Sequence, residues 1–207
     1  MLIKRFDSGI LSSNMYLVVE NGHAIVIDPA RNILPGKDLK IDLLIVTHEH
    51  YDHISGVNAW KAVYDAPLLC SEKCAQRLTD PRKNQARYFE VFCEMQSWMK
   101  LDTLPEIDTT YKCEADQTFN IEVVFFWQKH RIRLLEIPGH SPGGIGIYLD
   151  EKIFFSGDNL INNCEIELGF PGGSKKQWME FGQPRIKEIP KGTRIFPGHF
   201  DSFVLGL

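Results

Sequence analysis

The chain has few of the features that mark membrane, secreted or nucleic-acid-binding proteins. No apolar run approaches the roughly 20 residues that span a bilayer, and residues 1–7 lack the apolar core of a signal peptide. Runs of Lys and Arg are absent and the formal net charge is −4, so neither nucleic acid nor an anionic membrane is an expected partner. We therefore expect a cytoplasmic protein.

Cysteine is also scarce and has no framework spacing. The five cysteines are Cys70, Cys74, Cys93, Cys113 and Cys164. They form neither a disulfide pattern nor a zinc-finger pattern, and reduced thiols are expected in a cytosolic protein. Internal repeats, low-complexity segments and linkers are absent. With 207 residues, 43% of them hydrophobic and 24% charged, the chain is expected to form one globular domain over residues 1–207.

Metal-binding side chains are concentrated directly after one apolar strand. The strand predicted over residues 42–46 is followed by the sequence Thr47-His48-Glu49-His50-Tyr51-Asp52-His53. His48 and His50, two residues apart on an extended backbone, point the same way and can share one metal ion. Asp52 and His53 are adjacent and diverge, which suits a second metal ion beside the first.

Loops after other predicted strands carry further ligands of the same chemistry. Asp28, His140, Asp158 and His199 occupy these positions. Loops at one edge of a sheet are where binding groups collect. Together with Asp52 and Asp158, the five histidines that follow predicted strands are too many ligands for one tetrahedral ion and suit two ions that share a carboxylate. Imidazole and carboxylate ligands suit zinc, iron or manganese. Asp28 has an alternative interpretation, a carboxylate that caps the following turn.

Other segments have patterns that predict structure but not chemistry. Helices are expected over residues 54–64, 72–78, 82–100 and 174–188, and strands over 109–114 and 119–127. The aromatic face of residues 82–100 fits core packing or a wall over a substrate pocket. His130 lies in a predicted turn and is interpreted as solvated.

The motifs in their order resemble the metallo-β-lactamase superfamily. They are the stretch 47–53, Pro138-Gly139-His140-Ser141-Pro142-Gly143, Phe155-Ser156-Gly157-Asp158 and Pro197-Gly198-His199. Within it the chain is similar to the glyoxalase II (hydroxyacylglutathione hydrolase) group and its short relatives, which the loop Pro171-Gly172-Gly173-Ser174 supports. The resemblance implies an α/β fold, a four-layer αββα sandwich of two mixed sheets.

The resemblance also implies a role for each ligand. His48, His50 and His140 would bind the first metal ion. Asp52, His53 and His199 would bind the second ion, and Asp158 would bridge the two. Asp28 corresponds to the family's carboxylate behind the ligand loop, which orients ligands by hydrogen bonding. Two divalent ions per chain are expected, with zinc favoured and iron or manganese as alternatives.

The implied activity is hydrolysis of a thioester, ester or lactone by a hydroxide held between the metal ions. Asp52 and Asp158 would also serve in catalysis, by steering the hydroxide and moving its proton. Tyr51 at the pocket mouth, Cys164 and Lys175 are candidate contacts to a small acyl substrate. For Lys175 and its neighbour Lys176, a solvated pair at a helix start is the alternative.

The chain departs from glyoxalase II in two places. It ends eight residues after His199, without the helical extension whose basic residues bind glutathione, and residues 159–168 lack the family's glycine-arginine pattern. Two alternatives follow: a persulfide dioxygenase with a single iron, and a regulator on the same fold that binds a metabolite or a partner protein. A β-lactamase and an RNA-processing member are disfavoured. The sequence does not choose the substrate, the metal or the oligomeric state.

Overall fold

The central strands of the structure are apolar on both faces. In β3 (His23–Ile27), Ala24 and Val26 pack into one cluster of buried side chains, whereas Ile25 and Ile27 pack into another. Successive side chains of a strand point to opposite faces of its sheet. Both faces of this sheet are therefore covered, which is why the strand is a continuous apolar run.

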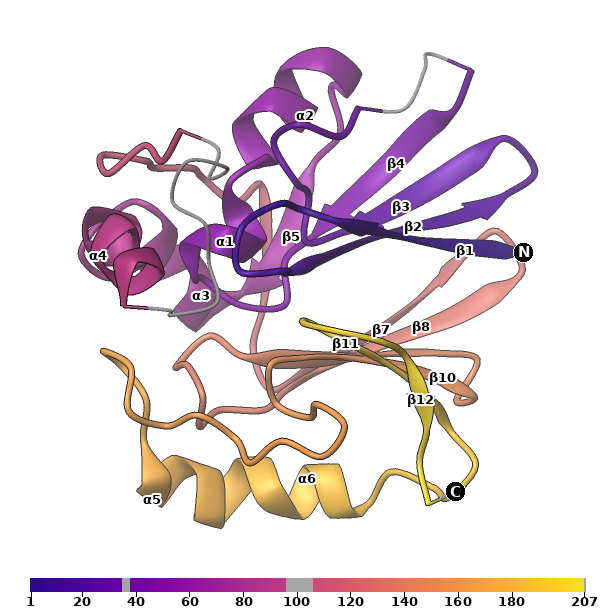
Figure 1. The fold of residues 1–207 in the computed structure, drawn as a ribbon. Coiled ribbons are helices and arrows are strands. Elements are labelled where there is room, and N and C mark those ends of the chain that lie inside the picture. The colour runs from indigo at the N-terminus through magenta and orange to yellow at the C-terminus, as the bar shows by residue number, and fades with distance from the viewer. Residues whose placement is uncertain (35–37, 96–105, 207) are drawn as a thin grey trace.

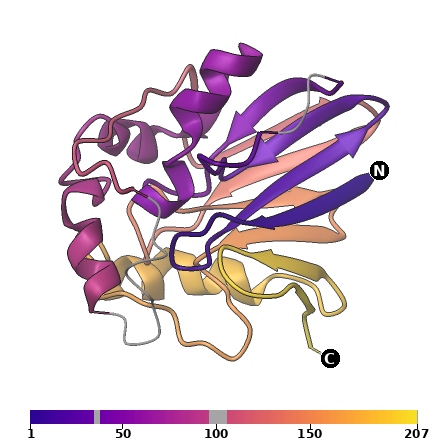
Figure 2. The same ribbon diagram turned by 45° about the horizontal axis from the view of Figure 1, so that its top comes forward.

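A computed structural model describes residues 1–34, 38–95 and 106–206, and the described residues form two six-stranded mixed sheets that lie face to face (Figure 1, Figure 2). The first sheet consists, in spatial order, of β1 (Leu2–Asp7), β2 (Asn14–Glu20), β3, β4 (Lys40–Ile45), β5 (Leu68–Ser71) and β6 (Gln117–Phe119). The second consists, in spatial order, of β12 (Phe203–Val204), β11 (Arg194–Pro197), β10 (Ile153–Gly157), β9 (Ile145–Leu149), β8 (His130–Glu136) and β7 (Glu122–Trp127).

Helices cover the outer face of each sheet (Figure 1). Those over the first sheet are α1 (Tyr51–Ile54), α2 (Val57–Tyr64), α3 (Glu72–Leu78), the 3₁₀ turn Ala86–Tyr88 and α4 (Phe89–Glu94). Those over the second are α5 (Lys175–Gln177), a π-helical turn at Trp178–Gly182 and α6 (Gln183–Lys187). Three buried clusters separate these layers, one between the sheets and one under each group of helices. The predicted αββα sandwich is confirmed.

Parallel pairing brings the ligand-bearing loops to one edge. Strands β3, β4 and β5 are mutually parallel, and β10 is parallel to β11. Parallel strands end at the same edge of a sheet, so the residues that follow them collect there. Among the described residues no helix is long and apolar enough to cross a bilayer.

The strand predicted over residues 109–114 is wrong. Tyr111 and Cys113 are buried between exposed neighbours, an alternation typical of a strand. Their backbone amides donate to Asp108 and Leu78, in a turn and at the end of a helix, so no strand ladder forms. Periodic burial here comes from packing on α2 and α3.

The aromatic helix predicted over residues 82–100 is shorter in the described region. It consists of the 3₁₀ turn and α4, and residues 96–100 lie outside the described residues. Phe89 is buried in the core, and Phe92 packs against that core while facing the site described below. This face therefore packs on the core and also lines a cavity, and both Phe89 and Phe92 contribute to that lining.

The interpretation of His130 as a solvated residue is also wrong. His130 begins β8 and is only 7% exposed, with its Nδ1 2.6 Å from Asp150 Oδ2 and its ring stacked on Trp127. Gln128 and Lys129 form the turn, and His130 pairs with Trp127 in the β7–β8 ladder, so its ring lies on the sheet.

Candidate metal centre

The ligand stretch 47–53 crosses from a loop into a helix. The loop after β4 carries His48 and His50, and one-turn helix α1 carries Asp52 and His53. All four side chains are at most 5% exposed. The short helix places the ring of His53 beside that of His48, with centroids 4.3 Å apart, and brings Asp52 and His53 into a second group.

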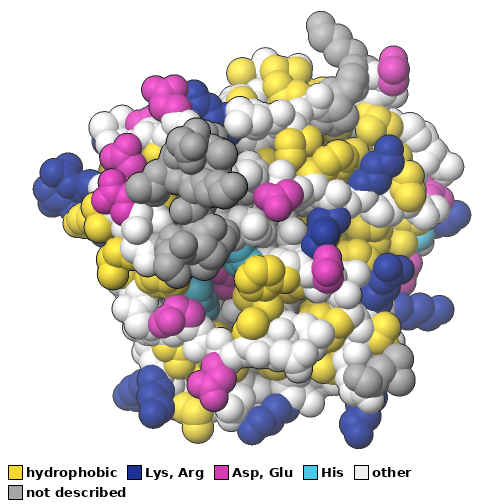
Figure 3. Space-filling model, viewed as in Figure 1, with side chains coloured by type: hydrophobic (Ala, Val, Ile, Leu, Met, Phe, Trp, Pro, Cys, Tyr) yellow, Lys and Arg dark blue, Asp and Glu magenta, His cyan; other side chains and the backbone are white. Residues whose placement is uncertain are grey.

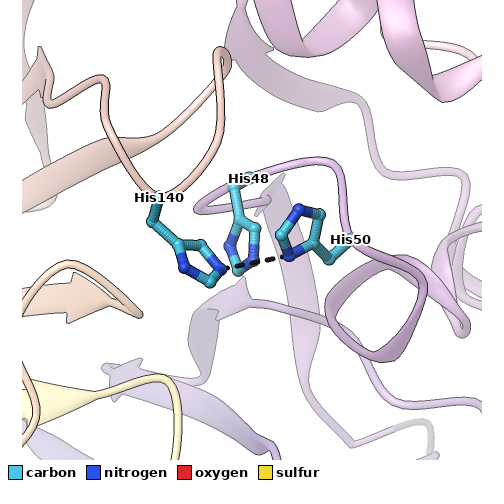
Figure 4. Close-up of side chains that lie close together, drawn as sticks. All are labelled: His48, His50 and His140. Carbon is cyan, nitrogen blue, oxygen red and sulfur yellow. Dashed lines mark hydrogen bonds between the residues drawn. The ribbon is translucent and has the colours of Figure 1, made fainter. Parts of the chain in front are cut away.

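The first group comprises His48, His50 and His140, whose ligand atoms all lie within 4.8 Å of one another (Figure 4). The Nε2 atom of His140 is 3.1 Å from Nδ1 of His50. His140 comes from the loop after β8, so the group joins the two sheets of the sandwich. The backbone carbonyl of Glu167 accepts a hydrogen bond from His140 Nδ1 and leaves Nε2 facing the other rings.

The second group comprises Asp52, His53 and His199, again within 4.8 Å. The Nε2 atom of His199 is 3.4 Å from Asp52 Oδ2. Asp158 lies between the groups, because its Oδ2 is 3.3 Å from Nε2 of both His140 and His199. The structure therefore brings together all seven side chains that the sequence suggested.

These spacings fit metal ions. Bonds of 2.0–2.1 Å in a tetrahedral site place neighbouring ligand atoms about 3.3 Å apart, and the separations above are 3.1–3.4 Å. Among the described residues, the buried atoms His48 Nε2, His53 Nε2 and Asp158 Oδ1 have no hydrogen-bond partner. Buried polar atoms ordinarily have one. Atoms without partners that face a shared space are the arrangement that a cation would satisfy.

The charges of His48, His50 and Asp158 agree with this fit. Burial and the neighbouring imidazoles lower the pKa of His48 and His50 well below its ordinary value, so both rings are neutral and offer lone pairs. Burial alone would raise the pKa of Asp158, but His199 and His53 hold it well below its usual range. The bridging position therefore carries an ionised carboxylate. Burial lowers the pKa of His53, His140 and His199, but the neighbouring carboxylates outweigh it and raise the pKa, so these rings would release a proton when a cation binds.

A sequence model described as the metallo-β-lactamase superfamily matches residues 8–199. The chain belongs to the metallo-β-lactamase superfamily. An uncharacterized protein of Aquifex aeolicus is 27% identical over 213 residues, covering 100% of this chain and 93% of that protein. The hydroxyacylglutathione hydrolase of Psychromonas ingrahamii is 23% identical over 185 residues, covering 87% of this chain but only 57% of that enzyme.

Two solved structures have the same fold. The BLEG-1 B3 metallo-β-lactamase has a TM-score of 0.78 at 22% identity and covers 99% of this chain and 95% of its own. TTHA1623 in a di-iron-bound form has a TM-score of 0.72 at 23% identity, and the match covers 100% of this chain and 96% of that protein. Membership of this superfamily of metallo-hydrolases makes the chain a hydrolase-type protein with a His/Asp cluster suited to divalent metal ions.

Asp28 lies behind the ligand stretch of this metallo-β-lactamase fold. Its Oδ1 accepts a hydrogen bond from the Thr47 amide at 2.6 Å, and its Oδ2 accepts from the Thr47 hydroxyl at 2.7 Å and from His53 Nδ1 at 3.0 Å. These bonds fix the start of the loop and aim His53 Nε2 at Asp52 and Asp158. Such carboxylate–imidazole contacts orient metal ligands and set their tautomer.

Glu49 is a functional residue that sequence reasoning missed. It is 0% exposed, its Oε1 is 2.6 Å from Arg77 Nε, and its Oε2 accepts from the Gly143 amide at 3.2 Å. The ion pair thus ties the loop of His48 and His50 to α3 and to the loop that presents His140. In the sequence Glu49 is a charged residue between two ligands, and nothing in that pattern indicates that its side chain is buried.

Gln85 is a second residue that the sequence did not reveal. Its amide lies 2.8 Å from His50 Nε2, and its backbone adopts the left-handed conformation, with φ of 69°. The nitrogen end of the amide faces the ring in the structure. Turning the amide by 180° places its carbonyl there, so that His50 donates from Nε2 and keeps Nδ1, the atom that faces His140, unprotonated. We infer that Gln85 sets the tautomer of His50.

Replacing Gln85 with leucine is therefore expected to weaken metal binding by about 10- to 100-fold without unfolding the chain, because the partner that orients a ligand is lost. Gln128→Leu is a matched control, since Gln128 is also a left-handed glutamine, with φ of 52°, but is exposed in the β7–β8 turn. Zinc affinities measured against a competing chelator compare the two variants. Equal affinities would show that Gln85 does not act on His50.

The three candidate substrate contacts have different outcomes. The prediction that Tyr51 lies at the pocket mouth is wrong. Its ring is 1% exposed in the core, and its hydroxyl accepts a hydrogen bond from the Asp108 amide. The helical turn at Tyr51 directs it away from the ligands. Cys164 is exposed and lines the cavity beside His140 and Asp158. Lys175 is exposed at the start of α5 and lines neither of the cavities at the site.

Two adjoining cavities lie at the ligands, with volumes of about 450 and 210 Å³. Both are lined by Leu11, Asp158, Phe170 and His199. Histidine surface is visible near the middle of the face in Figure 3, with hydrophobic and acidic side chains around it. A small molecule therefore has access to both groups of ligands.

Proposed function

We propose that this chain is a dinuclear metal-dependent hydrolase that cleaves a small thioester, ester or lactone. The observation that carries the proposal is the position of Asp158 Oδ2, 3.3 Å from the Nε2 atoms of His140 and His199, which belong to different ligand groups. A shared carboxylate is the usual way for two cations to be held a few ångströms apart. Zinc is the favoured metal, with iron or manganese as alternatives for the same ligands.

The ligand sets divide seven side chains between two ions. His48, His50 and His140 would hold one ion, Asp52, His53 and His199 would hold the other, and Asp158 would contact both. When bound, such cations lower the pKa of water from 15.7 to about 7 and polarise a carbonyl oxygen. Asp28, Glu49 and Gln85 keep the ligands in place by the contacts described above.

The two carboxylates at the cavity serve the reaction as well as the metals. Asp52 and Asp158 both line the smaller cavity, so each faces the space that water and substrate would enter. A carboxylate there orients the attacking water and accepts its proton. The apolar side chains of Phe89 and Phe92 close the same space on the α4 side and restrict bulk water.

Removing and restoring metal tests this proposal. Protein treated with a chelator is expected to lose hydrolysis of p-nitrophenyl esters, N-acetylcysteamine thioesters and lactones, and to regain it on addition of zinc, manganese or iron(II). Metal-free protein that still hydrolyses these compounds would contradict the proposal, as would fully loaded protein that hydrolyses none of them. One iron per chain with oxygen consumption on a persulfide would favour the dioxygenase instead.

A further inference from the structure

The larger cavity has an apolar wall that continues the core of the second sheet. The wall comprises Leu11, Leu160, Ile161, Ile166, Phe170, Trp178, Ile186 and Phe200. Trp178 is buried in the cluster beneath α5 and α6, and Leu160, Ile166 and Ile186 pack against that cluster. The wall is thus formed by the folded core and is present before any ligand binds. Its volume of about 450 Å³ lies in the range of small-molecule sites.

This wall ends at the metal ligands. His140, Asp158 and His199 line the same cavity, so a molecule whose reacting carbonyl lies at the ligands has its remaining part along the wall. The carbonyl of Glu167, in the loop that forms the wall, accepts the hydrogen bond from His140 Nδ1. The loop at residues 159–170 therefore supplies four side chains of the wall, Leu160, Ile161, Ile166 and Phe170, and also holds His140.

The charges along the wall are of one sign. Apart from the metal ligands, its acidic side chains are Glu165 and Glu167 beside the thiol of Cys164, and no Lys or Arg is among the described residues that line either cavity. The Glu167 carboxylate accepts a hydrogen bond from the Gly169 amide, whereas Glu165 is exposed. Among the described residues that line the wall, an anionic group would meet carboxylates and no counter-charge.

Three arginines of the described residues lie near this wall and are already engaged. Arg5 donates to the backbone carbonyl of Phe200 at 2.5 Å and pairs with Asp201 at 2.8 Å. Arg77, beside Gly172, is paired with the buried Glu49. Arg185, next to Ile186, donates to the backbone carbonyl of Glu136. None of the three arginines lines either cavity.

We infer that the wall binds the non-reacting part of the substrate as an uncharged apolar group, and that the chain discriminates against anionic carriers such as glutathione. This inference rests on the proposed hydrolase function for the identity of the reacting group. Each methylene that the wall removes from water contributes a factor of about four in affinity. An anion in the same place loses its hydration without gaining a partner among the described wall residues.

A pair of thioethers that cannot be hydrolysed tests the inference on metal-loaded protein. N-acetyl-S-hexylcysteamine and S-hexylglutathione share the hexyl group, but only the second is an anion. Calorimetric titration is expected to show at least tenfold tighter binding of the neutral thioether. Equal or tighter binding of S-hexylglutathione would overturn the inference.

Two variants place the binding at this wall. Glu165→Lys is expected to tighten S-hexylglutathione binding several-fold, whereas the control Glu180→Lys, the same charge change at an exposed glutamate outside the cavity, leaves it unchanged. Ile161→Asp, at a wall residue that is not among those packed on the buried cluster, is expected to weaken the neutral thioether by at least tenfold with an unchanged melting temperature and metal content. If neither substitution at the wall alters binding while both proteins remain folded, the inference fails.

The result is separable from the proposed function. If the chain hydrolyses no ester, thioester or lactone, the hydrolase proposal fails, and the thioether titrations still report whether the wall selects apolar groups. If hydrolysis is observed but is faster for S-lactoylglutathione than for a neutral thioester of equal reactivity, the hydrolase proposal stands and the inference on the wall fails.

Discussion

Asp158→Ala is expected to lower the hydrolytic rate at least about 1,000-fold and to weaken both metal ions. The carboxylate lies between the two ligand groups, so its loss removes a ligand from each. Metal ions contribute several kcal/mol to such reactions, and each 1.36 kcal/mol is a factor of ten in rate. Rates with p-nitrophenyl acetate and zinc affinities measured by competition give the two readouts.

His140→Ala is expected to weaken the binding of one metal ion, whereas Asp158→Ala is expected to weaken both. His140 belongs to the first group only, so its variant should retain one tightly bound ion of two. Asp201→Ala is the control for Asp158→Ala, because Asp201 is an exposed aspartate whose side chain is 89% accessible. If Asp158→Ala kept both affinities within a factor of three of the parent protein, Asp158 would not bridge the groups.

Arg77→Met is expected to destabilise the metal-free chain by about 3–5 kcal/mol. The substitution keeps an apolar side chain of similar length but leaves the Glu49 carboxylate buried, 0% exposed, without its cation. Removing one partner of a buried ion pair typically costs this much. For a chain of this size the melting temperature would fall by roughly 6–20 °C. Chemical denaturation of the metal-free protein measures the free energy of unfolding.

A second substitution separates the unpaired charge from the loss of packing. Glu49→Gln in the Arg77→Met background removes the charge and keeps an oxygen for the Gly143 amide. The double variant is expected to recover most of the lost stability. If it is no more stable than Arg77→Met alone, the cost lies in packing of the Arg77 side chain and the ion pair contributes little.

The sequence predicted the fold and the ligand candidates because both depend on local patterns. Apolar runs ending in His or Asp identify strands that deliver ligands to one edge, and the parallel pairing of β3 with β4 and of β10 with β11 makes those edges coincide. The pattern could not reveal which oxygen of Asp158 faces which histidine. That geometry depends on the packing of the second sheet against the first.

The residues that sequence reasoning missed are held by contacts between distant segments. Glu49 meets Arg77 and Gly143, and Gln85 meets His50 across 35 residues. A glutamate in a loop and a glutamine in a turn are ordinarily exposed. The error at Tyr51 has the same origin, because helix α1 turns that ring into the core. Residues 109–114 show the converse, an alternating burial pattern that arises without a strand partner.

The number of metal ions bound per chain tests the central claim most directly. Metal-free protein would be equilibrated with zinc by dialysis, and zinc and protein would be quantified by elemental analysis and absorbance. Two ions per chain are predicted for the parent protein, and one for His140→Ala. A single ion in the parent protein, or none, would contradict a dinuclear centre built from these seven side chains.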